Sequence, residues 1–394
     1  MNCYEDLVYR GLIKDMTNNE DFIEKLNAGG MTFYIGTDPT ADSLHLGHLS
    51  SFLICERLAR YGHHPIVLVG GATGMIGDPR PTAERQQQDI ATIMHNVDGL
   101  AGQLKKYFPK CEMVNNLDWT KEVTMIEFLR DIGKFFNVPY MLNKDIIRRR
   151  LEEGISYTEF SYMLLQANDF AWLYENKNCV MQVAGQDQWG NITSGIELIR
   201  KKFDKEAYAF TMPLVTTKSG VKFGKSEGNA LWLDKEKTSP YQMYQYLVNS
   251  EDEMVVQYLK VFTFLSKEEI DELEKATKEC PEKRLAGKAL AFEVVKFLHG
   301  EEEAIKARET SEKVFAGGIS DDMETEVISN VSKNIVDIVV AANIAPSKSE
   351  ARRLVEQGGI SIDGEKITDL KTEIDKDTFV LQKGKKKIIK VEMK

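Results

Sequence analysis

Apolar and polar positions along the first half of the chain predict a parallel β-sheet covered by helices. Residues 31–36 have the pattern of a short strand that ends at Gly36, and a helical pattern follows from 47 to 61. Continuous apolar runs at 66–70 and 179–184 are typical of strands that are buried on both faces. Because these strands alternate with helical segments, we expect an α/β unit whose ligands bind at the carboxyl ends of the strands.

The second half of the chain predicts two further units. From 239 to 315, apolar residues recur at helical spacing among many Glu and Lys residues, which predicts an all-helical domain. Gly317 and Gly318 break that pattern within an acidic stretch, and we place a linker at 316–331. The remainder predicts a small α+β domain, with helical and strand-like pieces at 335–342, 347–357, 360–362 and 379–381.

The composition is that of a globular protein. Apolar residues make up 42% and charged residues 28% of the 394 residues, which excludes a largely disordered chain. No run approaches the roughly 18 consecutive apolar residues of a spanning helix, and the first residues lack the pattern of a secretory signal. We therefore expect a cytoplasmic protein with no membrane partner, and its five widely spaced cysteines are interpreted as reduced thiols.

Charge is unevenly placed along the chain. The net charge is −10, yet residues 331–394 carry 13 Lys and Arg against 10 Asp and Glu. A basic end on an acidic body indicates contact with a polyanion. A solvated lysine tail is the alternative, and charge alone favours it.

A histidine pair marks the start of the helix after the first strand, in His45-Leu46-Gly47-His48. We expect Asp42 or Ser43 to cap this helix. Amides at a helix N-terminus attract anions, and two histidines on the first turn can donate to phosphate oxygens. Incidental histidines or a metal pair are the alternatives, although no Cys or Glu stands at a suitable spacing to complete a metal site.

A loop with two lysines, Lys222-Phe223-Gly224-Lys225-Ser226, suits the charge of a triphosphate or pyrophosphate. It does not have the spacing of a P-loop, because the first glycine of that motif would stand at Ser219. A solvated basic loop is the alternative.

Two further motifs follow predicted strands. The glycine-rich loop from Gly70 to Asp78 permits close approach of a ligand to the backbone, and Asp78 could pair with an ammonium group. Asp187 stands where a carboxylate can accept hydrogen bonds from both hydroxyls of a ribose. A simple glycine turn and a polar helix cap are the respective alternatives.

Polar side chains form a stripe along one predicted helix. Tyr162, Gln166 and Asp169 stand at i, i+4 and i+7, among apolar neighbours that indicate a buried helix. Buried polar groups require partners, which are either a small polar ligand or a neighbouring segment of the chain. The spacing does not decide between the two.

The order of these motifs resembles the bacterial-type tyrosyl-tRNA synthetase family of class I aminoacyl-tRNA synthetases, over nearly the whole chain. Residues 34–49 resemble the first signature of that family and residues 222–226 the second. The residues from 347 onward are similar to a small RNA-binding domain that also occurs in a ribosomal small-subunit protein. The family implies four parts, namely a Rossmann-like catalytic domain at 1–226 with a dimer-forming insertion near 120–160, a helical anticodon-side domain at 227–315, the linker at 316–331, and an RNA-binding domain at 332–394.

The resemblance also implies a role for each candidate residue. The tyrosine-binding residues would be Tyr34, Asp78, Tyr162, Gln166, Asp169 and Gln182. The ATP-binding residues would be Gly36, Asp38, Gly47, Asp187, Gln188, Val215 and Ser226. The catalytic residues, most of which would hold the departing pyrophosphate, would be Thr40, His45, His48, Arg85, Lys222 and Lys225. The tRNA-binding residues would be Arg352, Arg353, Lys385 and Lys386.

Two positions depart from the family pattern. Ile35 stands where cysteine is frequent, so one ribose contact is missing, and the loop after Asp78 lacks the lysine that is usual near its start. Arg80 is the residue that could substitute for this lysine.

The resemblance implies a reaction in two steps. L-tyrosine is activated with ATP to tyrosyl-adenylate and pyrophosphate, and the tyrosyl group then passes to the terminal ribose of tRNA(Tyr). Mg²⁺ would arrive with ATP, with no metal held by the protein alone, and the chain would form a homodimer. A tryptophanyl enzyme, a small nucleotidyltransferase and an RNA-binding scaffold without catalysis are the rival interpretations.

Overall fold

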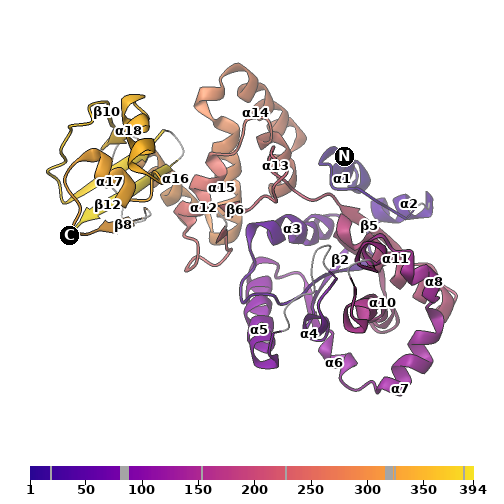
Figure 1. Ribbon diagram of the computed structural model, residues 1–394. Helices are drawn as coiled ribbons and strands as arrows, with labels where there is room; N and C mark the ends of the chain where they lie inside the picture. The colour runs from indigo at the N-terminus through magenta and orange to yellow at the C-terminus, as the bar shows by residue number, and fades with distance from the viewer. Residues whose placement is uncertain are drawn as a thin grey trace. The chain divides into compact units, whose positions relative to one another are not determined.

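The computed structural model describes residues 1–17, 20–79, 88–151, 154–226, 229–315, 323, 325–384 and 387–394 (Figure 1). The chain forms two compact units. The first comprises Met1–Asp234 and Lys260–Ser266, and the second comprises Lys235–Leu259 and Lys267–Lys394. Within the described ranges, none of the helices combines the length and the apolar character needed to span a bilayer.

The first unit is built on a five-stranded sheet in the order β3-β2-β1-β4-β5, with every pair parallel. Its strands are β1 (Thr32–Thr37), β2 (His64–Val69), β3 (Glu112–Asn115), β4 (Cys179–Gly185) and β5 (Tyr208–Met212). The chain proceeds outward from β1 in one direction through β2 and β3, and in the other through β4 and β5. The carboxyl ends of β1 and β4 therefore flank a topological switch point, where α/β proteins bind their ligands.

The predicted parallel α/β unit is confirmed, with boundaries shifted by one or two residues. The three strands expected at 31–36, 66–70 and 179–184 correspond to β1, β2 and β4. The two outer strands, β3 and β5, were not predicted. β3 is only four residues long and partly exposed, and β5 mixes small, aromatic and polar residues, so neither has a clear apolar run.

Two helices precede β1, and further helices follow the strands. They are α1 (Cys3–Tyr9), α2 (Glu20–Ala28), α3 (Leu46–Arg60), α4 (Thr73–Ile76), α5 (Ile90–Tyr107), α10 (Tyr157–Lys177) and α11 (Trp189–Phe203). α10 and α11 share one core with the strands, because Phe170 and Leu198 lie in the same buried cluster as Tyr34 and Cys179. A Cβ added at Gly195 on α11 would lie 3.0 Å from the Phe170 ring, so this glycine permits close helix packing.

A run of short helical pieces connects β3 to α10, as Figure 1 shows at the lower right. They are α6 (Leu117–Thr120), α7 (Met125–Glu127), the π-helical η1 (Phe128–Ile132), the 3₁₀ turn η2 (Gly133–Phe135), α8 (Val138–Leu142) and α9 (Asp145–Leu151). α9 is held to α10 by a buried ion pair between Arg150 and Glu159, with a nitrogen–oxygen distance of 2.9 Å.

The second unit begins with helices, which confirms the all-helical prediction for 239–315. They are α12 (Pro240–Val248), α13 (Val255–Phe262), α14 (Lys267–Glu279), the 3₁₀ turn η4 (Pro281–Lys283), α15 (Leu285–His299) and α16 (Glu301–Phe315). The last residues of α13 belong to the first unit. α12 has a capping box, in which the Ser239 side chain accepts from the Gln242 amide and Pro240 occupies the first helical position.

The C-terminal part of the second unit is an α+β domain, as predicted. Its sheet has the order β10-β9-β11-β12-β8. The elements are β8 (Thr325–Ile328), α17 (Ile335–Ala341), α18 (Lys348–Glu356), β9 (Ile360–Ile362), β10 (Glu365–Ile367), β11 (Thr378–Lys383) and β12 (Lys387–Met393). β8 lies inside the segment that we expected to be a linker. This part of the segment is a strand because it pairs in parallel with β12. Most of the rest of that segment lies outside the described residues.

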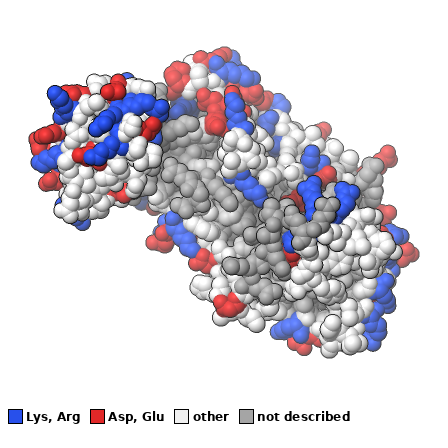
Figure 2. All heavy atoms as spheres, in the orientation of Figure 1, with Lys and Arg blue, Asp and Glu red and all other residues white. Residues whose placement is uncertain are grey.

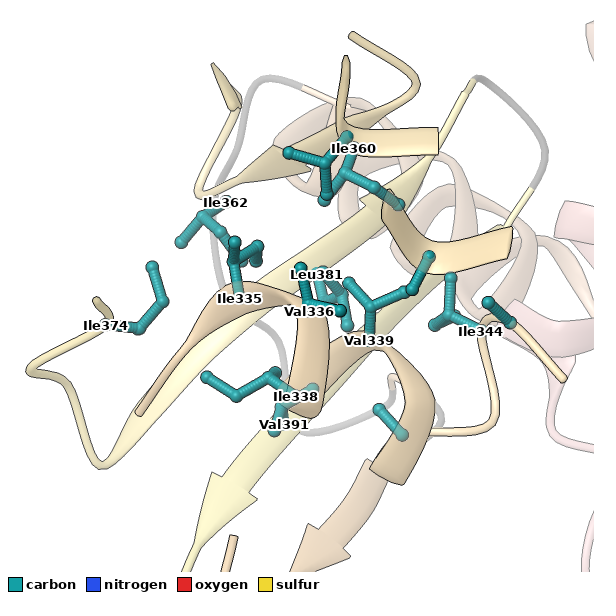
Figure 3. Close-up of a cluster of buried hydrophobic side chains, with 14 of the residues drawn as sticks. Ile335, Val336, Ile338, Val339, Ile344, Ile360, Ile362, Ile374, Leu381 and Val391 are labelled. Carbon is teal, nitrogen blue, oxygen red and sulfur yellow. The ribbon is translucent and has the colours of Figure 1, made fainter. Parts of the chain in front are cut away.

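An aliphatic core holds the C-terminal domain together. Figure 3 shows side chains from both helices and from the sheet pointing toward one another, among them Ile335, Val339, Ile360 and Leu381, which are all fully buried. Figure 2 shows Lys and Arg side chains gathered on the visible face of this domain, with acidic side chains beside them. The excess of basic residues at 331–394 is therefore displayed on a domain with its own core.

A buried ion network ties α1 to α3 and to the segment that follows α13. Asp6 accepts from Arg10 Nε at 2.7 Å and lies 3.5 Å from Arg57 Nη1. The two guanidinium groups in turn donate to backbone oxygens, of Lys260, Thr263 and Leu265 for Arg10 and of Thr263 for Arg57. Burial, with Arg10 beside it, lowers the pKa of Arg57 to about 9. One carboxylate thus compensates two buried cations.

Replacing this carboxylate should destabilise the first unit. We expect Asp6→Ala to reduce its free energy of unfolding by about 3–5 kcal/mol, because Arg10 and Arg57 would remain buried without their counterion. Urea titration followed by tryptophan fluorescence measures this, since all four tryptophans of the chain lie in the first unit. Asp21→Ala removes an ion pair with Lys25 that is about half exposed, and it should change the free energy far less. Equal losses in both variants would contradict the interpretation.

Candidate active site

Two buried polar atoms on the neighbouring strands β1 and β4, at the switch point, have no partners among the described residues. Tyr34 on β1 and Gln182 on β4 are register partners, so their side chains project from the same face of the sheet. Both side chains are buried, and neither Tyr34 Oη nor Gln182 Oε1 has a hydrogen-bond partner within the described part of the chain. Since unsatisfied buried polar atoms are rare and costly, these two atoms indicate a place for a polar ligand.

The carboxylate of Asp169 lies beside Tyr34 and is fixed by two donors. Asn116 Nδ2 donates to one oxygen at 2.9 Å, and Trp119 Nε1 donates to the other at 2.9 Å. Burial raises the pKa of Asp169 to about 7, while the Asn116 and Trp119 hydrogen bonds oppose that rise. Burial and the charge of Asp169 together raise the pKa of the Tyr34 hydroxyl well above its usual value, so this hydroxyl stays protonated.

Asn116 is a functional candidate that sequence analysis missed. Its side chain accepts from the Ala72 amide at 2.8 Å and donates to Thr73 Oγ1 at 3.0 Å as well as to Asp169. It therefore connects the end of β3, the glycine-rich loop and α10. An Asn-Asn pair directly after β3 was the feature that could have indicated it. Because β3 was not predicted, Asn116 was not recognised as a residue at a strand end.

Asp38, at the end of β1, lies against the same loop. Its carboxylate accepts from Thr73 Oγ1 at 2.8 Å and from the Tyr162 hydroxyl at 3.1 Å. A Cβ at Gly70 would lie 2.5 Å from the Asp38 carboxylate and 2.2 Å from Thr73 Oγ1, so only glycine fits at this position. The glycine of the loop is thus used for contact with a half-buried carboxylate of the chain itself.

Asp78 closes the glycine-rich loop at the other side of the site. Gln188 Nε2 donates to it at 2.7 Å, and Asn191 Nδ2 donates to it at 3.1 Å and to Gln166 Oε1 at the same distance. Burial raises the pKa of Asp78 to about 6, with Asp38 adding to the rise and the two amide donors opposing it. Asn191 was not among the predicted residues.

These contacts resolve the question of the polar stripe on α10 in favour of neighbouring segments. Tyr162 donates to Asp38, Gln166 accepts from Asn191, and Asp169 accepts from Asn116 and Trp119. The chain thereby concentrates three carboxylates, of Asp38, Asp78 and Asp169, in one small region. Such a group attracts a cation with several hydrogen-bond donors, and the unpaired Tyr34 and Gln182 atoms extend it toward a further polar group.

The histidine turn lies at the start of α3, and its cap differs from our expectation. His45 itself is the N-cap: its Nδ1 accepts from the His48 amide at 3.3 Å, and His48 Nδ1 accepts from the His45 amide at 3.4 Å. Neither Asp42 nor Ser43 caps this helix, and Ser43 instead bonds to Leu44 O and to Gln103. Because both Nδ1 atoms are acceptors, each ring can donate through Nε2 only.

The two histidine rings stack, and His48 remains neutral. Their centroids are 3.8 Å apart with planes at 14°. Burial lowers the pKa of His48 to about 3, with the charges of His45 and Lys222 acting in the same direction. His48 is therefore a neutral donor at physiological pH, which suits contact with an anion without a change of protonation.

The lysine loop packs on this histidine turn, so the structure brings the two motifs together. The Leu46 amide donates to Leu231 O at 2.8 Å, and the Leu231 amide donates to Gly224 O at 3.0 Å. Gly224 has a φ of +92°, and a Cβ there would lie 3.0 Å from the Gly47 nitrogen. Glycine is thus required at 224 for backbone conformation and for close approach.

The remaining predicted residues have varied surroundings. Gly36, Thr40, Asp187 and Lys222 are exposed, and Val215 is half-buried. Gln188 Nε2 lies 3.5 Å from Asp187 in addition to its contact with Asp78. Lys225 and Ser226 form the short strand β6 (Lys225–Ser226), which pairs with β7 (Asn229–Ala230). Arg85, Lys385 and Lys386 lie outside the described residues, and Arg352 and Arg353 lie exposed on α18 of the second unit.

Comparison with known proteins identifies relatives along the whole chain. The model of the family "tRNA synthetases class I (W and Y)" matches residues 26–316, and that of the "Tyrosine--tRNA ligase SYY-like C-terminal domain" matches residues 315–391. The tyrosine–tRNA ligases of Streptococcus uberis and of Streptococcus pyogenes serotype M1 are each 46% identical to this chain over 412 residues, covering 98% of it and 99% of their own length.

Solved structures agree with these matches. A C-terminally truncated mitochondrial tyrosyl-tRNA synthetase of Aspergillus nidulans has a TM-score of 0.73 at 31% identity, covering 79% of this chain and 94% of its own. The corresponding protein of Coccidioides posadasii has a TM-score of 0.70 at 32% identity, with 79% and 92% coverage.

The hydrogen bond from Asn116 should control the ionisation of Asp169. We expect Asn116→Ala to raise the pKa of Asp169 above its value of about 7, because a donor to the charged form is lost. Because the pKa of Asp169 is higher in the folded than in the unfolded state, protonation of Asp169 contributes to folding stability at low pH, and this contribution is lost as pH rises through the folded pKa. In Asn116→Ala this loss of stability should extend to higher pH.

Carboxyl carbon NMR on protein labelled at aspartate measures this titration. The matched control is Asn191→Ala, which should raise the pKa of Asp78 and leave that of Asp169 in place. A pKa of Asp169 that does not move in Asn116→Ala would show that the contact does not act on the carboxylate.

Proposed function

Because the chain belongs to the tyrosyl-tRNA synthetase family of class I tRNA synthetases, we propose that the site at the switch point binds L-tyrosine beside ATP. The chain activates tyrosine with ATP to tyrosyl-adenylate and pyrophosphate, and then transfers the tyrosyl group to the terminal ribose of tRNA(Tyr). The residue roles are those that the family resemblance implies, and the geometry of the site supports them.

The observation that carries the assignment of the substrate is the pair of partnerless atoms next to Asp169. A tyrosine side chain in this pocket brings a phenol hydroxyl, which can donate to Asp169 and accept from Tyr34 Oη. Gln182 lies beside the substrate, where its Oε1 gains a partner on binding. Phenylalanine would leave these buried groups unpaired, and this is the physical basis of its rejection.

The ammonium group of tyrosine fits the carboxylates at the other end of the pocket. Asp78 provides the charge, and Tyr162 and Gln166 provide oxygen acceptors on α10. The Gln188 and Asn191 amides already satisfy part of Asp78, so they hold its oxygens in place for the incoming cation. A nearby cation favours the charged carboxylate, and tyrosine binding therefore lowers the pKa of Asp78 from about 6.

ATP lies along the ends of β1 and β4 in this proposal. Asp187 accepts hydrogen bonds from the ribose hydroxyls, with Gln188 next to it. Gly36, Asp38, Gly47 and Val215 border the adenosine, where Gly36 and Gly47 allow the nucleotide to approach the backbone. Ser226 belongs to the same loop as the lysines.

The pyrophosphate is held between the histidine turn and the lysine loop. His45 and His48 donate through Nε2, since their Nδ1 atoms are occupied by the helix cap. Thr40, Lys222 and Lys225 complete the set, together with Arg85, which lies outside the described residues. Mg²⁺ arrives with ATP and shares its phosphate oxygens, because Mg²⁺ usually keeps its waters and binds through the nucleotide.

Catalysis follows from position and charge. The tyrosine carboxylate attacks the α-phosphorus in line, and it needs no general base because it is already ionised. The rate gain comes from holding the two substrates in register and from stabilising charge on the leaving pyrophosphate. His45, the neutral His48 and the lysines are the groups placed to do this.

The tRNA and the partner subunit require surfaces outside the pocket. Arg352 and Arg353 on α18, with Lys385 and Lys386, are proposed contacts with RNA phosphates. A homodimer face is proposed on the insertion, because large apolar side chains are exposed there, namely Val123, Met125, Ile126, Leu129, Val138 and Tyr140. We place the protein in the cytoplasm, where its tRNA substrate is used.

The domain limits are proposed as the resemblance implied them. They are a catalytic domain at 1–226 with the insertion near 120–160, a helical domain at 227–315 on the anticodon side, a linker at 316–331 and an RNA-binding domain at 332–394. The match of a separate C-terminal family model from residue 315 supports a division in this region.

The phenol assignment is tested at Asp169. We expect Asp169→Ala to abolish tyrosine-dependent ATP–pyrophosphate exchange almost completely, because the phenol loses its acceptor and Asn116 and Trp119 lose theirs. The control is Asn168→Ala, at the half-buried neighbouring position on α10, which should retain activity. Exchange that persists in Asp169→Ala would rule out this phenol site.

The pyrophosphate assignment is tested at Lys225. We expect Lys225→Ala to lower kcat for adenylate formation about 10²–10³-fold while KM for tyrosine hardly changes, because the lysine acts on charge that develops in the transition state. Rapid-quench measurement of the first step separates the two constants. Lys218→Ala, an exposed position before the same loop, is the control. A parallel loss of tyrosine affinity in Lys225→Ala would count against the role.

The dimer assignment is tested on the exposed face of the insertion. We expect Ile126→Asp to convert the dimer to monomer, since a charge would be buried in an apolar interface. Sedimentation velocity gives the oligomeric state directly. Val8→Asp places the same charge on another exposed apolar position, on α1, and should leave the dimer intact. A dimer that survives Ile126→Asp would place the interface elsewhere.

A further inference from the structure

Two of the five cysteines lie on neighbouring segments of the first unit. Cys55, on α3, is fully buried, and Cys111, just before β3, is partly exposed. Burial raises the pKa of the Cys55 thiol well above its usual value, and Cys111 beside it adds to the rise. The reaction described above uses neither thiol.

The backbone around this thiol pair is held in place from both sides. The rings of Phe52 and Phe108 have centroids 6.1 Å apart, and Glu56 Oε1 forms an ion pair with Lys110 Nζ at 3.1 Å. The residues on either side of Cys55 on α3 thus meet the residues that precede Cys111. These two contacts, one on each side of the thiol pair, fix the approach of the two segments, so the positions of the thiols do not depend on one adaptable side chain.

We propose that Cys55 and Cys111 are a reversible oxidation site, which forms an intramolecular disulfide when the protein meets hydrogen peroxide or a similar hydroperoxide. Cys111 is the accessible thiol and reacts first, and Cys55 resolves the product. The order follows from exposure, because the oxidant reaches a partly exposed sulfur and not one enclosed by the core.

The chemistry balances with the hydroperoxide as the only oxidant. The Cys111 thiolate attacks one peroxide oxygen, so an S–O bond forms, the O–O bond breaks, and the departing hydroxide takes up the thiol proton as water. Cys55 Sγ then attacks the sulfenic sulfur, the S–S bond forms and the S–O bond breaks, and the second hydroxide leaves with the Cys55 proton as water. Two thiols lose two electrons in total, and one peroxide is reduced to two waters.

The disulfide should alter the tyrosine site, and this expectation rests on the proposed function. A disulfide bond of about 2.05 Å is shorter than any non-bonded contact of two sulfurs, so the thiols have to approach by at least on the order of 1–2 Å. α3 packs with Phe52, Leu53 and Leu58 buried, so the surface segment before β3 is the part that moves. β3 runs only from Glu112 to Asn115, and the next residue is Asn116, which holds Asp169.

Oxidation therefore displaces Asn116, whose side chain orients Asp169, the proposed acceptor for the phenol hydroxyl. We expect KM for tyrosine in the exchange assay to rise at least about threefold, because small displacements of positioning groups are costly. KM for ATP should change little, since the nucleotide does not contact Asn116 in the proposed arrangement. Reduction with dithiothreitol should restore the original value.

The test treats the full-length protein with hydrogen peroxide and maps its thiols. Two thiols should disappear, and proteolysis without reduction should yield a linked pair of peptides that contain Cys55 and Cys111. Cys111→Ser should abolish both the link and the change in KM. Cys280→Ser removes the other partly exposed thiol, in the second unit, and should respond as the parent does.

Several results would overturn the proposal. A response of Cys111→Ser equal to that of the parent, links between two copies of the chain through Cys111, or oxidation of Cys111 to a sulfinic acid with no link would exclude the disulfide site. A link that forms without any change in KM for tyrosine would exclude the coupling to the pocket. Since peptide mapping does not depend on activity, it also separates failure of this site from failure of the proposed function.

Discussion

Asp169 is a carboxylate enclosed by the protein, and most of the pocket is arranged around the two hydrogen bonds that it accepts. Enclosure opposes its charge and raises its pKa to about 7. Asn116 and Trp119 oppose that rise and fix both oxygens, which leaves the remaining lone pairs for a ligand. The side chains that satisfy Asp169 come from the segment after β3, so the outermost strand of the sheet takes part in a site centred on β1 and β4.

Other carboxylates of the first unit are likewise held by hydrogen-bond donors or cations. Asp38 is held by Thr73 and Tyr162, and Asp78 by Gln188 and Asn191. Far from the pocket, Asp6 offsets two buried arginines. In each case neutral donors or cations keep an enclosed carboxylate in place, and the three carboxylates of the pocket are partnered in a way that still leaves room for a cation. Tyr34 Oη and Gln182 Oε1 are the buried side-chain atoms of this site that lack partners within the described part of the chain, which distinguishes the ligand position from the supporting network.

Prediction from sequence succeeded where a pattern depends on local geometry. Buried apolar runs identified β1, β2 and β4, and helical spacing identified α3 and the helices from α12 to α16. It failed for β3, whose four residues are partly exposed, and with β3 it missed Asn116 and Trp119. The expected cap of α3 was wrong because His45 supplies its own ring nitrogen, an unusual cap that residue preferences do not favour.

The sequence by itself determined the order of the motifs, the α/β and all-helical character of successive segments, and the family, because these depend on residue type and spacing along one chain. The tertiary structure alone decided which groups satisfy the polar stripe of α10, which two buried atoms of the site remain unpaired, and which thiols are neighbours. Those facts depend on distances between residues that are tens of positions apart, such as Asn116 and Asp169 or Cys55 and Cys111. No local pattern records such distances, since they are set by how strands and helices pack around a common core.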